Sequence, residues 1–115
     1  MTNELSELDK ALLAAANWNK AGHVFALLAL GADIMAVDEN GNTAANLLAM
    51  YNNGDAVVRL AEINPAVLMM WGDLTPAHWL AVYNNGDAVV RLAAINPEAL
   101  LLKTPEGFTA GMILA

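Results

Sequence analysis

The sequence predicts an all-α fold built from repeated helix-turn-helix units, and three observations support this. The segment YNNGDAVVRLAEINP at 51–65 returns 32 residues later, with one change, as YNNGDAVVRLAAINP at 83–97. A period of about 20–50 residues is typical of stacked supersecondary units. Apolar residues recur at helical spacing within both copies. Thr43, Thr75 and Thr109 each precede an apolar stretch that begins with small residues, as a helix-capping residue would.

The first two helices are predicted near the N-terminus. In TNELSELDKALLAAA, the cap-type residues Thr2, Asn3 and Ser6 accompany an amphipathic run with leucines on one face. After the polar break WNKAG, a second and nearly all-apolar helix is predicted at 23–30. Gly31 then supplies the left-handed residue that commonly ends a helix. The two helices form one pair.

The next units follow the same plan. The segment 31–42 is rich in Asp, Asn and Gly and predicts an extended loop tipped by a turn. Thr43 is expected to cap the next helix, and Asp55 and Asp87 to cap the second helices of their units. The first helix of the third unit, TPAHWLAVY, has Pro76 at a position that suits proline.

The spacing also predicts the number of units. Gly22, Gly54 and Gly86 lie 32 residues apart and make the first helix pair a divergent copy of the other two. Three helix pairs and half of a fourth follow, in one domain, 1–115, with approximate repeats at 5–37, 38–70, 71–103 and 104–115. The interval from Thr75 to Thr109 is two residues longer than the preceding one, so the 100–108 loop should differ from its predecessors.

Neighbouring units are expected to stack because a single helix pair cannot cover its own apolar faces. Alanines on the first helices allow a close approach. The residues predicted to meet across this stack are Leu47, Leu48, Val58, Leu60 and Ile63 of one unit, and Trp79, Leu80, Val90, Leu92 and Ile95 of the next.

Composition narrows the possible functions. Hydrophobic residues make up 57% of the chain, which argues against disorder, but no apolar stretch approaches the roughly 18 residues of a membrane helix. The formal charge of −7 argues against nucleic acid and anionic membranes as partners and favours a protein with a basic patch. The acidic N-terminus is unlike a secretion signal, and the absence of cysteine suits a reducing compartment. A cytoplasmic, intracellular module is expected.

The residues suggest no enzyme chemistry. His78 near Asp73 is the one histidine–carboxylate combination at a helix start, but acid-base catalysis also needs a cleft and a positioned partner. His23 is expected to act as a helix cap. Two histidines without cysteine do not predict a metal site, Asp38 and Glu39 lack the spacing of a calcium loop, and the NNGD segments lack the Gly-Lys-Ser/Thr of a phosphate loop. No catalysis, cofactor or metal is expected.

Several motifs together resemble the ankyrin repeat family. LLALGADIMAVDENGNTAANLLA at 27–49 contains the family's G-A-D close, D-x-x-G-x-T turn and alanine-rich helix, and GDLTPAHWLA at 72–81 contains T-P-x-H. The likeness covers nearly the whole chain from about Leu12. Proline occurs at only one helix start, the NNGD turns are about two residues longer than the common form, and Ile-Asn-Pro replaces G-A-D in two units. The resemblance implies an ankyrin-like helix-turn-helix solenoid with extended loops between repeats.

The resemblance also implies a function and a surface. Ankyrin arrays bind proteins through a concave face formed by first-helix ends and loop tips, and their T-P-x-H histidine, here His78, is structural and bonds backbone between repeats. Two columns of residues one repeat apart fall at first-helix ends: Trp18, Met50 and Val82 form one, and Asn19, Tyr51 and Tyr83 the other. The two tyrosines either contact a partner or brace the NNGD turns. Trp71 should pack or bind. The partner-binding candidates are Trp18, Asn19, Glu39, Asn40, Asn42, Met50, Tyr51, Met70, Trp71, Asp73, Val82, Tyr83, Glu106 and Phe108.

Protein–protein recognition, as a scaffold without catalysis, is therefore the predicted function. The alternative is a structural or assembly role, because the apolar half-repeat TAGMILA has no polar cap and uncapped array ends self-associate. That end would equally suit a fragment of a longer array. Ankyrin-like modules also occur among proteins that intracellular bacteria deliver into host cells, and nothing in these residues decides that point.

Overall fold

A computed structural model describes residues 5–114, and within them the fold is all-α, as predicted. These residues form seven α-helices and two 3-10 helices, without strands. The elements are α1 (Glu7–Asn17), α2 (Ala21–Ala29), α3 (Ala44–Met50), α4 (Gly54–Ile63), η1 (Pro65–Met69), α5 (Pro76–Val82), α6 (Gly86–Ile95), η2 (Pro97–Leu101) and α7 (Ala110–Leu114). The cap candidates Thr2 and Asn3 and the last residue, Ala115, lie outside the described residues.

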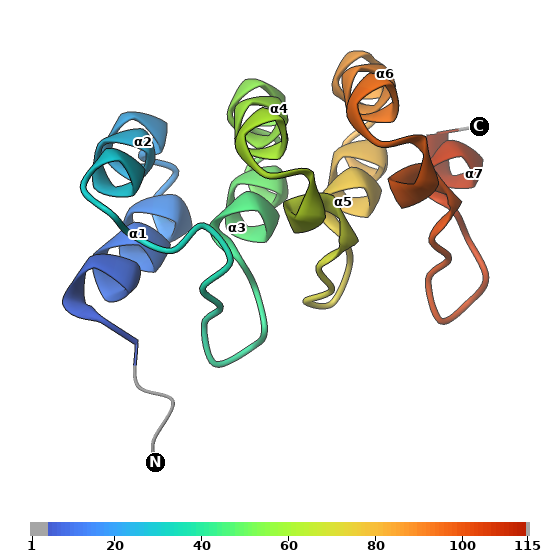
Figure 1. Ribbon diagram of the computed structural model, residues 1–115. Coiled ribbons are helices and arrows are strands. Elements are labelled where there is room, and N and C mark those ends of the chain that lie inside the picture. The colour runs from blue at the N-terminus through green and yellow to red at the C-terminus, as the bar shows by residue number, and fades with distance from the viewer. Residues whose placement is uncertain (1–4, 115) are drawn as a thin grey trace.

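The helices are arranged in pairs (Figure 1). α1, α3, α5 and α7 form the lower row of the view, and α2, α4 and α6 form the upper row. In the lower row α3 packs between α1 and α5, and α5 packs against α7; in the upper row α4 packs against α6. Within residues 5–114, α7 therefore has no companion in the upper row, and α6 is the last helix of that row.

Each lower-row helix is capped at its N-terminus by a serine or threonine hydroxyl. The hydroxyl of Ser6, Thr43, Thr75 or Thr109 accepts a hydrogen bond from the backbone N–H three residues later, at distances of 3.1, 3.3, 3.4 and 3.2 Å respectively. This satisfies one of the unpaired N–H groups of each first turn. The predicted Thr43 cap is confirmed.

The caps of α4 and α6 lie two residues earlier than predicted. Asn53 and Asn85, not Asp55 and Asp87, cap α4 and α6, and each side-chain oxygen accepts the N–H of the alanine three residues on. The two aspartates lie in the first helical turn, where their charge complements the helix dipole. Lys20 occupies the same position before α2, and its side chain makes no cap hydrogen bond.

The first unit is also offset by one residue from the predicted alignment. The turns between paired helices place Asn19, Asn52 and Asn84 in the left-handed region, with φ of 56°, 58° and 59°. These positions are 33 and then 32 residues apart. His23 is consequently the third residue of α2 and matches Ala56 of α4, so the expectation that it caps the helix was wrong.

The ends of the upper-row helices differ. α2 is closed by Gly31 at φ 109°, with the Gly31 and Ala32 N–H groups bonded to the Leu28 and Leu27 carbonyls. This is the arrangement that a left-handed glycine permits. α4 and α6 instead end at an Asn-Pro pair, and the chain continues into η1 and η2. The sequence patterns did not predict these 3-10 helices.

The core lies between the two rows. Leu12, Leu48, Leu60, Leu80 and Leu92 are completely buried. Each such side chain contributes roughly 1.5–3 kcal/mol of transfer free energy. None of the helices in residues 5–114 is both long and apolar enough to cross a bilayer.

Two of the residues predicted to stack are exposed instead. Ile63, the last residue of α4, is 58% exposed, whereas its counterpart Ile95 at the end of α6 is partly buried against the core. Val90 is 68% exposed because no upper-row helix among the described residues follows α6.

The loops between units come in two forms. In 38–42, the Asp38 and Gly41 N–H groups bond the Asn42 and Asp38 carbonyls; in 104–108 the equivalent groups make the same pair of bonds. The intervening loop is closed more tightly, by a bond from the Gly72 N–H to the Leu74 carbonyl. The last loop was predicted to differ from both earlier loops. It differs from the tighter loop at 72–74 but shares the hydrogen bonds of the loop at 38–42.

Candidate binding site

The tyrosines of the two copied segments join neighbouring units. The Tyr83 hydroxyl donates to the Met50 carbonyl at 2.7 Å, and the Tyr51 hydroxyl donates to the Asn17 carbonyl. Both acceptors are the last residues of lower-row helices, where carbonyls lack helical partners. The tyrosines therefore brace the stack, although their side chains remain 50% and 46% exposed at Tyr51 and Tyr83.

The one-residue offset rearranges the predicted columns. Trp18, Tyr51 and Tyr83 are the C-cap residues of α1, α3 and α5, so they form one column. Asn17, Met50 and Val82 form the other. Trp18 has no preceding unit to brace among the described residues, and it is 73% exposed. Asn19, predicted beside the tyrosines, belongs to the left-handed turn position.

Asparagines form a second link between units. The Asn53 side-chain amide donates to Asn19 Oδ1 at 2.8 Å, and that of Asn85 donates to Asn52 Oδ1 at 2.9 Å. The same two asparagines cap α4 and α6 through their oxygens. Asn53 and Asn85 thus each cap a helix and donate to the preceding unit, where the acceptors, Asn19 and Asn52, are the left-handed residues of the preceding turns.

The glycine of this turn sets how closely the upper-row helices approach. A Cβ on Gly54 would lie 2.7 Å from the Ala88 Cβ and 2.8 Å from the Asn85 side-chain nitrogen, closer than such atoms pack. Ala21 occupies the equivalent position at the start of α2. Its methyl group prevents an equally close contact between α2 and α4, and a small cleft separates these two helices.

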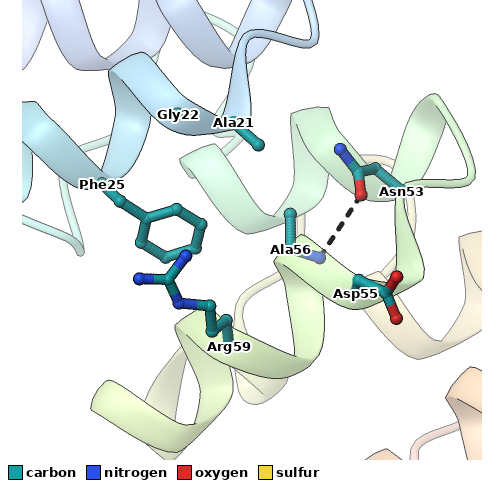
Figure 2. Close-up of a pocket in the computed structure, with 7 residues that line it drawn as sticks. All are labelled: Ala21, Gly22, Phe25, Asn53, Asp55, Ala56 and Arg59. Atoms are coloured by element: carbon teal, nitrogen blue, oxygen red, sulfur yellow. Dashed lines mark hydrogen bonds between the residues drawn. The ribbon is translucent and has the colours of Figure 1, made fainter.

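Figure 2 shows the side chains that line this cleft. Its volume is about 190 Å³, and its lining consists of Ala21, Gly22, Phe25, Asn53, Asp55, Ala56 and Arg59. The Arg59 guanidinium lies 3.9 Å from the centre of the Phe25 ring, a cation–π contact that closes one end. Ligand pockets usually measure about 300–1,000 Å³, so the cleft is too small for a typical ligand.

A groove of about 290 Å³ lies between α1, α3 and the 38–42 loop. Its apolar floor is formed by Leu13, Ala14 and Leu47, and its polar side by Asn17, Asp38, Glu39 and Asn40. The groove thus brings together Glu39 and Asn40, two of the predicted site residues. Its other members were missed, because the contact between α1 and a loop that follows α2 depends on how the units stack.

Of the two carboxylates in the groove, Asp38 is hydrogen-bonded within the loop and Glu39 is exposed. Asp38 Oδ1 accepts the N–H groups of Asn40 and Asn42 at 2.9 and 3.0 Å, and these bonds fix the loop. Glu39 follows at the exposed tip. A carboxylate beside an apolar floor suits the stem and charged head of a Lys or Arg side chain.

The remaining loop candidates are scattered. Asp73 and Glu106 are exposed, Met70 is partly buried and Phe108 is 48% exposed. Asn42 is only 6% exposed, and its Oδ1 would lie 1.7 Å from a Cβ on Gly72. Asn42 is therefore a buried packing residue beneath the next loop, and its prediction as an exposed loop-tip contact is corrected.

Trp71 and His78 pack together. Their ring centres are 5.1 Å apart, so the tryptophan, 36% exposed, covers a completely buried histidine. His78 Nδ1 accepts the Thr75 N–H at 3.3 Å, and Nε2 lies 2.9 Å from the Leu102 carbonyl. This pairing assigns the neutral tautomer with the proton on Nε2. Asp73 is not among the histidine's partners.

The histidine bond closes one unit instead of joining two, which corrects the predicted role between repeats. Leu102 lies at the end of the unit that begins with α5. Equivalent side chains do the same in the other units, because Asn46 donates to the Met70 carbonyl at 3.4 Å and Asp9 accepts the Asp33 N–H at 2.8 Å. In all three cases the partners are 24 residues apart.

No metal-binding arrangement is present among residues 5–114, where no three His, Cys, Asp or Glu side chains gather closely enough to hold an ion. A comparison with protein-family profiles gives no match, and a search of curated proteins gives no significant one. The site is thus defined by its own geometry: a partly acidic groove beside the bracing column of aromatic residues.

Proposed function

We propose that this chain is an ankyrin-like solenoid that binds a protein partner without catalysing a reaction. The groove between α1, α3 and the 38–42 loop is the observation that carries the proposal. It combines an apolar floor with Glu39 at an exposed tip, beside a lower-row helix end. A partner segment with a Lys or Arg flanked by apolar residues would complement it in shape and charge.

The ankyrin-like part of the proposal draws support from two features. The helices pair through tight turns, and His78 of the T-P-x-H segment is buried and tied to backbone. Trp18 and Tyr51 lie close along the chain to the groove residues Asn17 and Leu47, and their exposed rings would extend the contact surface. Aromatic residues of this kind are enriched among the strongest contacts of protein interfaces.

Selection of peptides from a random library, with the full chain as the target, tests this proposal. We expect selected peptides to be enriched in Lys or Arg next to apolar residues. Their affinity should fall at least about tenfold in a Glu39→Lys variant, since one close charge pair is replaced by repulsion. Glu62→Lys, on the exposed side of α4, is the matched control and should bind normally.

A library that yields no binding peptide would contradict the proposed function. Peptides that bind the Glu39→Lys variant and the parent chain equally well would contradict the proposed groove.

A further inference from the structure

The outer face of α6 repeats a face that is covered in α4. Val58 lies on α4, against which α6 packs, and is 4% exposed, whereas the equivalent Val90 of α6 is 68% exposed. A Cβ on Gly54 would strike α6, whereas one on Gly86 would meet nothing within 4 Å. Figure 1 shows α6 at the end of the upper row. The same local sequence thus has a partner in one helix and none among the described residues in the other.

The contact that α6 makes with α4 shows which groups fit the outer face of a second helix. Three donors of the later unit reach three acceptors of the earlier one: Tyr83 donates to the Met50 carbonyl, Asn85 to Asn52 Oδ1, and Arg91 to Asp55 at 2.7 Å. All donors lie on the incoming helix and its turn, and all acceptors on the receiving unit. The contact is therefore directional.

The equivalent acceptors around α6 are the Val82 carbonyl, Asn84 Oδ1 and the Asp87 carboxylate. None receives a hydrogen bond from residues 5–114. Arg91, one turn after Asp87, donates to Asp55 on the preceding helix instead. With Gly86 and Val90 between them, these groups form a surface that we call the α6 socket: Val82, Asn84, Gly86, Asp87 and Val90.

We propose that the α6 socket is a second docking surface, independent of the groove, for a partner helix that supplies hydrogen-bond donors and has the chemistry of the chain's own second helices. Such a helix carries a tyrosine, an asparagine two residues later and an arginine eight residues after the tyrosine. Its tyrosine hydroxyl would reach the Val82 carbonyl, its asparagine amide Asn84, and its arginine Asp87, while Gly86 and Val90 receive its apolar side.

The charge and shape of the socket favour such a partner over a second copy of this chain. Two copies meeting through their sockets would oppose acceptors with acceptors and leave all of them without donors. Docking α2 of a second copy on α6 would bring α1, which packs on α2, onto the position that α7 already fills. A separate helix that supplies donors meets neither obstacle.

A synthetic peptide with the sequence of residues 83–101 provides the test. A covalent link between its positions 90 and 94, which would face away from the socket, keeps it helical, as circular dichroism verifies. Fluorescence anisotropy then measures its binding to the full chain. We expect saturable binding that falls at least about tenfold with Val90→Asp or with Asp87→Arg in the protein. A peptide with Arg91→Asp should recover much of the affinity for the Asp87→Arg variant.

Glu39→Lys is the control, because it alters the groove and should leave binding of the 83–101 peptide unchanged. Loss of groove binding with unchanged socket binding distinguishes the two proposed sites. Absence of binding by the helical peptide would overturn the inference, as would equal binding by the Val90→Asp variant. A chain that dimerises in sedimentation equilibrium and becomes monomeric with Val90→Asp would assign the socket to a second copy and refute the proposed partner.

Discussion

Alanine in place of the turn glycine should have opposite effects in the two identical turns. At Gly54 the added methyl group would lie 2.7 Å from the Ala88 Cβ, about 1 Å inside normal contact between carbon atoms. Pushing α4 from α6 or distorting the turn costs about 1–3 kcal/mol, typical of overpacking. At Gly86 the same change meets nothing within 4 Å and should stabilise by up to about 0.5–1 kcal/mol, because alanine restricts the unfolded chain.

Neither glycine has a positive φ, so backbone strain does not enter the comparison. The expected difference between the two variants is about 1.5–4 kcal/mol in the free energy of unfolding. In a domain of this size that corresponds to roughly 10 °C or more in Tm. Urea and thermal unfolding followed by circular dichroism at 222 nm measure it. A Gly54→Ala variant as stable as Gly86→Ala would refute this packing of the upper row.

Three further changes test the local contacts. Lys20→Asn should stabilise the chain by about 1 kcal/mol in urea unfolding, because α2 lacks the side-chain cap of its counterparts. His78→Ala should cost about 2–3 kcal/mol by leaving buried groups unpaired, and His78→Asn should cost less if it keeps the bond to Leu102; equal losses would contradict this. The Asp33 N–H lowers the pKa of Asp9 below 3.8, so its contribution to stability is present above that pH and lost as the pH falls through the lowered pKa. Asp9→Asn should therefore flatten unfolding profiles in this acidic range, and an unchanged profile would exclude the contribution.

The sequence predicts those features that depend on a few adjacent residues. Thr43 and Thr75 cap helices because the hydroxyl and the N–H that donates to it are three residues apart. Gly31 ends α2 because the required conformation is local. The all-α class follows from the same short-range signals, summed along the chain.

The contacts between units could not be predicted from the sequence. The first turn has Lys20 and Ala21 where the other turns have Asn and Gly. Matching Gly22 to the other turn glycines therefore displaces the first unit by one residue and wrongly makes His23 a cap. Asn42 looks like an exposed loop residue until Gly72 covers it. The groove likewise depends on α1 meeting a loop that lies beyond α2.

The exposure of the outer face of α6 is a separate case. Val58 and Val90 have identical neighbours in sequence, yet one is buried and the other exposed. They differ because α6 packs against α4, whereas no helix of residues 5–114 packs against the outer face of α6. Periodic patterns give the same prediction for both valines, so they cannot show which of the two is covered within residues 5–114.

The most direct test of partner binding is an amide chemical-shift titration of the full chain with a peptide selected on it. We expect the shifts to concentrate on the groove, at Leu13, Ala14, Asn17, Glu39 and Asn40, and Glu39→Lys to abolish them. Shifts centred instead on the α6 socket would contradict the groove as the binding site, and shifts on no contiguous surface would contradict the proposed function.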